Sequence, residues 1–144
     1  MNDVIVVDGN DLILGRLAAY VAKKALLGYT VEIVNAEGII VTGSRKIVCN
    51  KYKILVNKGG PRFGITILRS PRGIFKLAVK RMLPHKKVRG REALARIKAY
   101  KGLPVRFKDQ KLETIEHANV SKVPNLKYVT LQEISNFLGG KWKL

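Results

Sequence analysis

The sequence predicts a small layered α/β domain with a mostly parallel sheet, and three observations carry that prediction. The chain has 144 residues, of which 47% are hydrophobic, so it is the size of one domain with an ordinary core. Its first third alternates short β-branched runs with helical apolar spacing, the pattern of parallel strands joined by helices. A basic stretch follows, in which two helices flank a loop. We therefore expect a single domain over residues 1–144.

The N-terminal part of the chain predicts a strand, a helix and a second, parallel strand. Val4 to Val7 is a β-branched run typical of a strand covered on both faces. Asn10 or Asp11 can cap the helix that follows, and Gly28 closes it. Val31 to Val34 is the second buried strand. The apolar positions of the helix are Leu14, Leu17, Ala18, Val21 and Ala25.

A third short strand and another helix come next. Ile39 to Val41 forms the strand, and Ser44 can cap a helix from Arg45 to Val56. Cys49 lies in the apolar pattern of this helix and has no second cysteine to pair with, so we expect a small core residue in a reducing compartment. The core-facing residues expected here are Ile47, Val48, Tyr52 and Leu55.

Residues 58–69 predict a loop, because glycines and Pro61 interrupt regular structure. A short strand at Ile65 to Leu68 is compatible with this pattern. The glycines allow close backbone approach to a phosphate. Phe63 is either a packing anchor or a stacking surface for an unpaired base.

The basic stretch predicts a helix, a loop and a helix. Ser70 caps a helix that begins at Pro71, and Pro84 ends it. On this helix Ile74, Phe75, Ala78, Val79 and Met82 form an apolar flank, opposite cations that recur every four residues. A basic loop follows, and Arg91 to Tyr100 forms the second helix, with Leu94 and Ile97 inward.

The C-terminal third gives one clear element. Thr130 and Glu133 have capping-box spacing, so a helix begins there, with Leu131, Ile134 and Leu138 on its apolar face. Residues 105–123 carry only a hint of a strand near Ile115. Trp142 either packs on the domain or contacts a partner.

The net charge of +18 is segregated along the chain. Residues 58–111 hold 17 Lys or Arg and 2 acids, and no acid occurs from Gly38 through Arg91. A solvated surface would mix both signs, so this segment predicts a site for a polyanion, with nucleic acid first and an anionic membrane second. We interpret residues 58–111 as a basic RNA-binding region set on a nearly neutral scaffold.

Catalytic readings find weaker support. Asp8, Asp11 and Glu37 can meet at one edge of a parallel sheet and hold metal ions for a nuclease, although helix caps and turns explain such acids more often. His85 has no nearby acid to orient it as a base. The two histidines and one cysteine show no zinc-ligand spacing. The N-terminus lacks a signal-peptide pattern and no apolar run spans a bilayer, so we expect a cytoplasmic protein without cofactor.

The most specific motif of the chain runs from Met82 through Gly90, with Arg91-Glu92-Ala93 and Gly102-Leu103-Pro104 after it. These residues closely resemble the signature of the large-subunit ribosomal protein L thirteen family, in its archaeal and eukaryotic branch. The similarity covers nearly the whole chain. Other matching segments are Leu14-Gly15-Arg16-Leu17-Ala18, Val34-Asn35-Ala36-Glu37, Thr42-Gly43, Gly60-Pro61-Arg62-Phe63-Gly64, Arg69-Ser70-Pro71 and Leu131 to Gly139.

Two features depart from the family pattern. Lys80-Arg81 stands where the family has an Arg-Gly pair, and the chain ends soon after Trp142, without the long extension of eukaryotic members. The resemblance therefore points to the archaeal type.

The resemblance implies a three-layer α/β/α domain with a four-stranded parallel sheet. It also implies a structural constituent of the large ribosomal subunit, without catalysis, bound to large-subunit ribosomal RNA and next to other ribosomal proteins. We expect phosphate contacts and stacking of arginine planes on bases. The contacts predicted are Arg62, Arg69, Arg72, Lys76, Lys80, Arg81, His85, Lys86, Lys87, Arg89, Arg91, Arg96 and Lys98.

Overall fold

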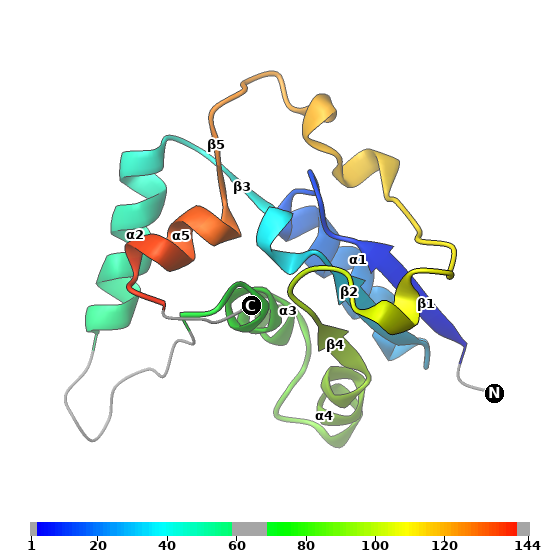
Figure 1. The fold of residues 1–144 in the computed structure, drawn as a ribbon. Coiled ribbons are helices and arrows are strands. Elements are labelled where there is room, and N and C mark those ends of the chain that lie inside the picture. The colour runs from blue at the N-terminus through cyan, green and yellow to red at the C-terminus, as the bar shows by residue number, and fades with distance from the viewer. Residues whose placement is uncertain (1–2, 59–68, 141–144) are drawn as a thin grey trace.

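A parallel sheet is the framework of the computed structural model, which describes residues 3–58 and 69–140 (Figure 1). Its strands β1 (Val4–Asp8), β2 (Thr30–Val34) and β4 (Ile97–Ala99) lie in the order β1-β2-β4. Both pairings are parallel, with Val4 opposite Thr30 and Val31 opposite Ile97. The predicted mixed α/β fold with a mostly parallel sheet is therefore confirmed.

Helix α1 (Leu14–Leu26) connects β1 to β2 and buries the apolar residues expected of it. Neither Asn10 nor Asp11 caps the helix, so that prediction was wrong. Leu12 and Ile13 are buried and pair with Asn119 and Ile40, respectively, so the chain stays extended for two residues longer. The helix consequently begins after Ile13, without a side-chain cap.

Helices α3 (Pro71–Met82) and α4 (Val88–Ala95) pack beside α1. Right-handed crossovers between successive parallel strands place all of these helices on the same face of the sheet. The start of α3 is as predicted, because Ser70 Oγ accepts a hydrogen bond of 3.2 Å from the Gly73 amide. Phe75 is fully buried in the core between helices and sheet. The basic segment is therefore an integral part of the fold, not an insert on a scaffold.

The predicted helix from Arg91 to Tyr100 was wrong, because this stretch is divided between α4 and β4. The helix ends at Ala95, and the Arg96 carbonyl then accepts a hydrogen bond from the Val31 amide of β2. The Tyr100 amide donates to the Ile33 carbonyl in the same way. The backbone groups along the edge of β2 require hydrogen-bond partners. Pairing with β4 satisfies them, and this outweighs the helical spacing of the apolar residues in this stretch.

The other face of the sheet is covered by a 3₁₀ turn, η2 (Val105–Phe107), within the described residues. Phe107 packs on Val6 and Val34, where the resemblance implied a layer of helices. The chain then pairs briefly with β1, since the Glu113 amide donates to the Val6 carbonyl at 2.8 Å. Further 3₁₀ turns, η3 (Glu116–Ala118) and η4 (Val120–Lys122), occupy the region where a strand was hinted.

The predicted third strand exists but belongs to a separate antiparallel pair. After a 3₁₀ turn, η1 (Ala36–Gly38), strand β3 (Ile40–Thr42) pairs with β5 (Tyr128–Thr130). The parallel sheet consequently has three strands in the described chain, where about four were expected. The Ile40 amide donates to the Leu12 carbonyl at 2.9 Å, which ties this pair to the framework.

Helices α2 (Arg45–Asn57) and α5 (Leu131–Phe137) flank the β3–β5 pair, on the left in Figure 1. Thr130 Oγ1 accepts a hydrogen bond from the Glu133 amide, so the predicted start of α5 is confirmed. Helix α2 buries Val48 and Cys49, but Ile47 is 71% exposed, contrary to prediction. This helix packs against the domain along one narrow side. No helix in the described chain is long and apolar enough to cross a membrane.

Candidate nucleic-acid interface

Helix α3 presents cations on one side and core residues on the other. Ile74, Phe75 and Val79 are buried, whereas the basic residues on the opposite side are exposed. Met82 is 46% exposed, so its predicted place in the apolar flank was wrong. The burial of the apolar side fixes the direction in which the charges point. The exposed cations of α3 are Arg72, Lys76, Lys80 and Arg81.

Three predicted contacts from two elements meet at one cavity. Arg72 and Lys76 of α3 and Lys98 of β4 line a hollow of about 430 Å³, together with Gly73, Ala99 and Tyr100. Strand β4 is at the edge of the sheet, and its exposed Lys98 lines the cavity together with residues from the first turns of α3. Convergent cations around a hollow suit a phosphate group.

A buried carboxylate lies behind this cavity. Glu32 is 6% exposed, and its two oxygens lie 3.4 Å from Lys98 Nζ and 2.8 Å from Arg106 Nη2. The guanidinium of Arg106 also bonds the Tyr100 hydroxyl and covers the rings of Tyr100 and Phe107, at 4.7 and 4.4 Å from their centroids. Glu32 thus pairs with two cations, of which Lys98 lines the cavity.

Glu32 and Arg106 were absent from the predicted contact set. A signal for Glu32 was present, because an acid in the middle of a buried strand requires a partner. Its partners lie 66 and 74 residues away, so the sequence gives no indication of which cations they are.

A second group of exposed cations lies in the loop between α3 and α4 and in the first turn of α4. Its base is fixed, because the His85 amide donates to the Leu83 carbonyl and the Lys87 amide to the Pro84 carbonyl. Gly90 is buried against Pro84, so no side chain fits there. His85 itself is half-buried. The cations of this group are Lys86, Lys87, Arg89 and Arg91. All four are exposed, and none forms an ion pair within the described chain.

The remaining predicted contacts differ in their availability. Arg96 donates to the Ala25 carbonyl at 3.3 Å and lies 3.9 Å from Glu92, so it is partly engaged within the protein. The exposed Arg69 is tied through its backbone, because Ser135 Oγ donates to its carbonyl at 2.6 Å. Arg62 and Phe63, with the strand predicted at Ile65 to Leu68, lie outside the described residues. Trp142 does so as well.

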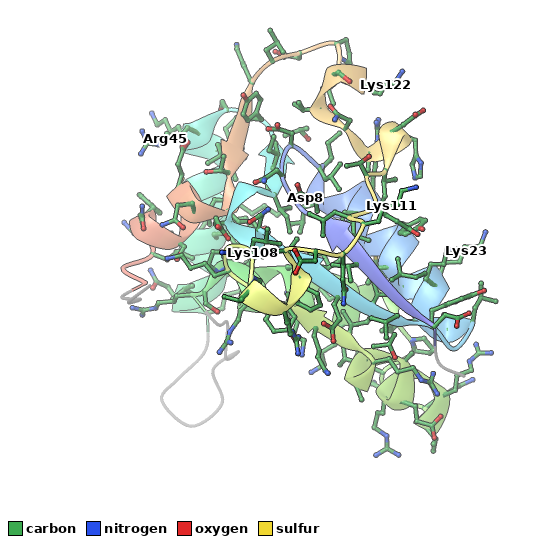
Figure 2. All side chains as sticks on the ribbon, turned by 45° about the vertical axis from the view of Figure 1, so that its right-hand side comes forward. Asp8, Lys23, Arg45, Lys108, Lys111 and Lys122 are labelled. Carbon is green, nitrogen blue, oxygen red and sulfur yellow. The ribbon has the colours of Figure 1, made fainter. Side chains whose placement is uncertain are left out.

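Basic side chains also occur beyond the predicted region. Figure 2 shows Lys23 and Arg45 on opposite sides of the molecule and Lys122 on the upper segment. Within residues 58–111, Lys108 and Lys111 lie along the segment that crosses the second face of the sheet. Lys23, Arg45 and Lys122 lie outside that range, on separate parts of the molecule.

Two of the three carboxylates of the nuclease hypothesis, Asp8 and Glu37, serve as structural acceptors. Asp8 Oδ1 accepts hydrogen bonds of 3.0 Å from the Asn10 amide and the Asn35 side chain. Both oxygens of Glu37 accept from the Gly102 amide at 3.0 Å. No group of three or more His, Cys, Asp or Glu residues in the described chain is arranged to hold a metal ion. These acids therefore organise the loops at the carboxyl ends of the strands.

The fold and this surface define a small basic α/β protein with a large excess of exposed cations. Residues 2–106 match the family described as ribosomal protein L13. The chain is 40% identical over 137 residues to the large ribosomal subunit protein uL13 of Methanococcoides burtonii, covering 95% of this chain and 99% of that protein. It is 42% identical over 135 residues to the uL13 protein of Haloarcula marismortui, covering 94% and 90%. The chain belongs to the ribosomal protein L13 family.

Proposed function

We propose that this chain is a structural constituent of the large ribosomal subunit that binds and stabilises large-subunit ribosomal RNA during assembly and in the mature ribosome. Its relatives are named large ribosomal subunit proteins. The observation that carries the proposal is the cavity lined by Arg72, Lys76 and Lys98, where two elements bring cations together. Such a protein acts in the cytoplasm, next to other ribosomal proteins, and needs no cofactor or substrate.

The proposed mechanism is phosphate neutralisation combined with a fixed shape. The cations of α3, the α3–α4 loop and β4 are spread over rigid elements, so they meet phosphates at set spacings. Residues 58–111 provide most of these contacts. If half of the thirteen predicted residues contact phosphates, the log–log slope of affinity against salt is about −4 to −6.

The test is binding of the purified chain to large-subunit ribosomal RNA over a range of salt concentrations. An Arg72→Ala/Lys76→Ala variant is expected to bind more weakly, with a slope reduced in magnitude by about 1.4 to 1.8. Lys122→Ala/Lys127→Ala is the matched control, because it removes the same charge from exposed positions outside the cavity. Equal losses in both variants, or binding that does not depend on salt, would contradict the proposal.

Two rival functions are tested with the same protein. A nuclease built on Asp8, Asp11 and Glu37 requires magnesium-dependent RNA cleavage that Asp8→Asn abolishes. A peripheral membrane protein requires binding to anionic vesicles that RNA does not displace. Sedimentation of a cell lysate through sucrose, with the chain found in the large subunit at moderate salt, supports the ribosomal assignment against both rivals.

A further inference from the structure

A second cavity lies between α2 and α5, away from the basic stretch. It measures about 580 Å³ and is lined by Arg45, Lys46, Cys49, Asn50, Lys53 and Phe137. All but Phe137 come from α2, and Figure 2 shows Arg45 on the side of the molecule opposite Lys23. None of these residues falls within residues 58–111 or in the predicted contact set.

The walls of this cavity combine an apolar interior with a cationic rim. Phe137 is the last residue of α5 and is 49% exposed, whereas Cys49, which also lines the cavity, is buried. Covering a half-exposed phenyl ring with an apolar surface is stabilising. The cavity of about 580 Å³ has room for a flat aromatic group, which can stack against this ring.

The charge on the rim selects an anionic occupant. Helix α2 carries four Lys or Arg and no acid between Arg45 and Asn57. One acid approaches the cavity, Glu133 of α5, and it lies 3.8 Å from Arg45 in an exposed ion pair. Such a pair contributes little, and it leaves Lys46 and Lys53 without an acidic partner in the described chain.

We propose that this cavity holds an unpaired nucleotide of the bound RNA, with its base against Phe137 and its flanking phosphates on Lys46, Lys53 and Arg45. Proteins hold unstacked nucleotides by this combination of aromatic face and surrounding cations. The amide of Asn50 supplies both a donor and an acceptor for the base edge. The inference rests on the proposed RNA-binding function and adds a base-contacting site to a surface otherwise expected to bind phosphates.

The test compares two probes that differ only in their bases. The full chain is titrated, at about physiological salt, with a labelled ten-nucleotide oligouridine and with the same ribose-phosphate backbone lacking bases. The chain is expected to bind oligouridine more tightly. Phe137→Ala is expected to lose about five- to a hundredfold in affinity for oligouridine while binding of the abasic probe is unchanged.

Three further variants make the result specific. Phe137→Tyr keeps the ring and is expected to bind as the original chain does. Tyr128→Ala removes an exposed aromatic residue of β5 that does not line the cavity, and it is expected to leave both affinities unchanged. Lys46→Ala/Lys53→Ala is expected to weaken both probes equally, with a salt slope reduced in magnitude by about 1.4. Melting temperatures show whether each variant is folded.

Each contrary outcome has a distinct meaning. If Phe137→Ala binds oligouridine as the original chain does, or loses affinity equally for both probes, the nucleotide site is overturned. If it keeps oligouridine binding but enters large subunits poorly, the cavity receives a neighbouring protein and the proposal is again overturned. Failure of the unaltered chain to bind large-subunit ribosomal RNA would instead refute the proposed function itself.

Discussion

Arg106 Nη2 lies 2.8 Å from Glu32 Oε2, and this contact links the 3₁₀ turn η2 to a carboxylate in β2, the middle strand of the parallel sheet. Glu32 is buried, whereas the side chains of its two cationic partners are each 53% exposed. The acid is therefore compensated from the solvent side. One of its two partners, Lys98, also lines the candidate cavity.

The Glu32→Gln substitution tests the structural part of this network. It removes the charge that pairs with Lys98 and Arg106, and we expect the free energy of unfolding to fall by about 1–3 kcal/mol. Urea denaturation measures the change. Glu116→Gln, at an exposed acid of η3, is the control and should change stability by less than about 0.5 kcal/mol. Equal effects would show that Glu32 contributes no more than a surface acid.

Gly90→Ala is expected to destabilise the chain, because a Cβ at this position would overlap the carbonyl group of Pro84. The cost should be about 1–3 kcal/mol, since backbone atoms on both sides must move. Gly15→Ala in α1 is the matched control, because a Cβ there meets no atom within 4 Å. Alanine has the higher helix propensity, so this variant should be as stable as the original chain or up to about 1 kcal/mol more stable. Thermal melting distinguishes the two variants, and a neutral Gly90→Ala would contradict the packing described.

Reversing three charges in the α3–α4 loop and the first turn of α4, with Lys86→Glu, Lys87→Glu and Arg89→Glu, should abolish RNA binding at moderate salt. These side chains are exposed, so the variant should still unfold cooperatively, with a melting temperature within a few degrees of the original. The control reverses the charge at three other exposed lysines, Lys23, Lys122 and Lys127, so it has the same net charge as the test variant. If the control loses as much affinity, total charge governs binding and the loop has no special role.

Because of Tyr52, the free energy of unfolding is expected to decrease at alkaline pH. Burial raises the pKa of its hydroxyl above the usual 10.0, and the nearby Arg81 partly opposes that rise. The folded state therefore retains the Tyr52 proton after the unfolded chain begins to lose it. This contribution is complete below about pH 10 and is lost as pH rises through the folded-state pKa.

The comparison with Tyr52→Phe isolates this effect from the titration of lysines, which both proteins share. Unfolding free energies measured from pH 8 to pH 11 should show the original chain losing stability relative to Tyr52→Phe above about pH 10. A difference that stays constant over this range would contradict the raised pKa.

Local patterns predicted the elements whose neighbours are also local. Val31 to Val34 is buried on both faces of the sheet, as its β-branched run predicted, whereas in the run from Val4 to Val7 only Val6 and Val7 are buried and Val4 is 57% exposed. Ser70 and Thr130 cap helices through contacts three residues along the chain. Each of these signals is complete within a few residues.

The errors arose where distant partners decide the structure. Ile97 and Ala99 are buried on either side of exposed Lys98, a period-two pattern too short to outweigh the helical spacing of Leu94 and Ile97. Ile40 pairs with Thr130, and nothing near either residue identifies the other. Within the candidate site, the sequence indicated the cations but not the carboxylate that organises them. The α2–α5 cavity was missed because its residues come from two segments far apart in sequence.

The pairing of β3 with β5 has a consequence for the order of folding during synthesis. The parallel sheet is complete once residue 99 has been made, whereas β3 waits for residues 128–130 and α2 for the α5 helix that follows them. At about 5–20 residues per second, translation separates the two events by roughly two to six seconds. In that interval Ile40 and Val48 are not yet covered by β5 and α5, and exposed apolar residues of this kind favour aggregation. Binding of the already synthesised basic segment to RNA would reduce the time that the incomplete chain spends free.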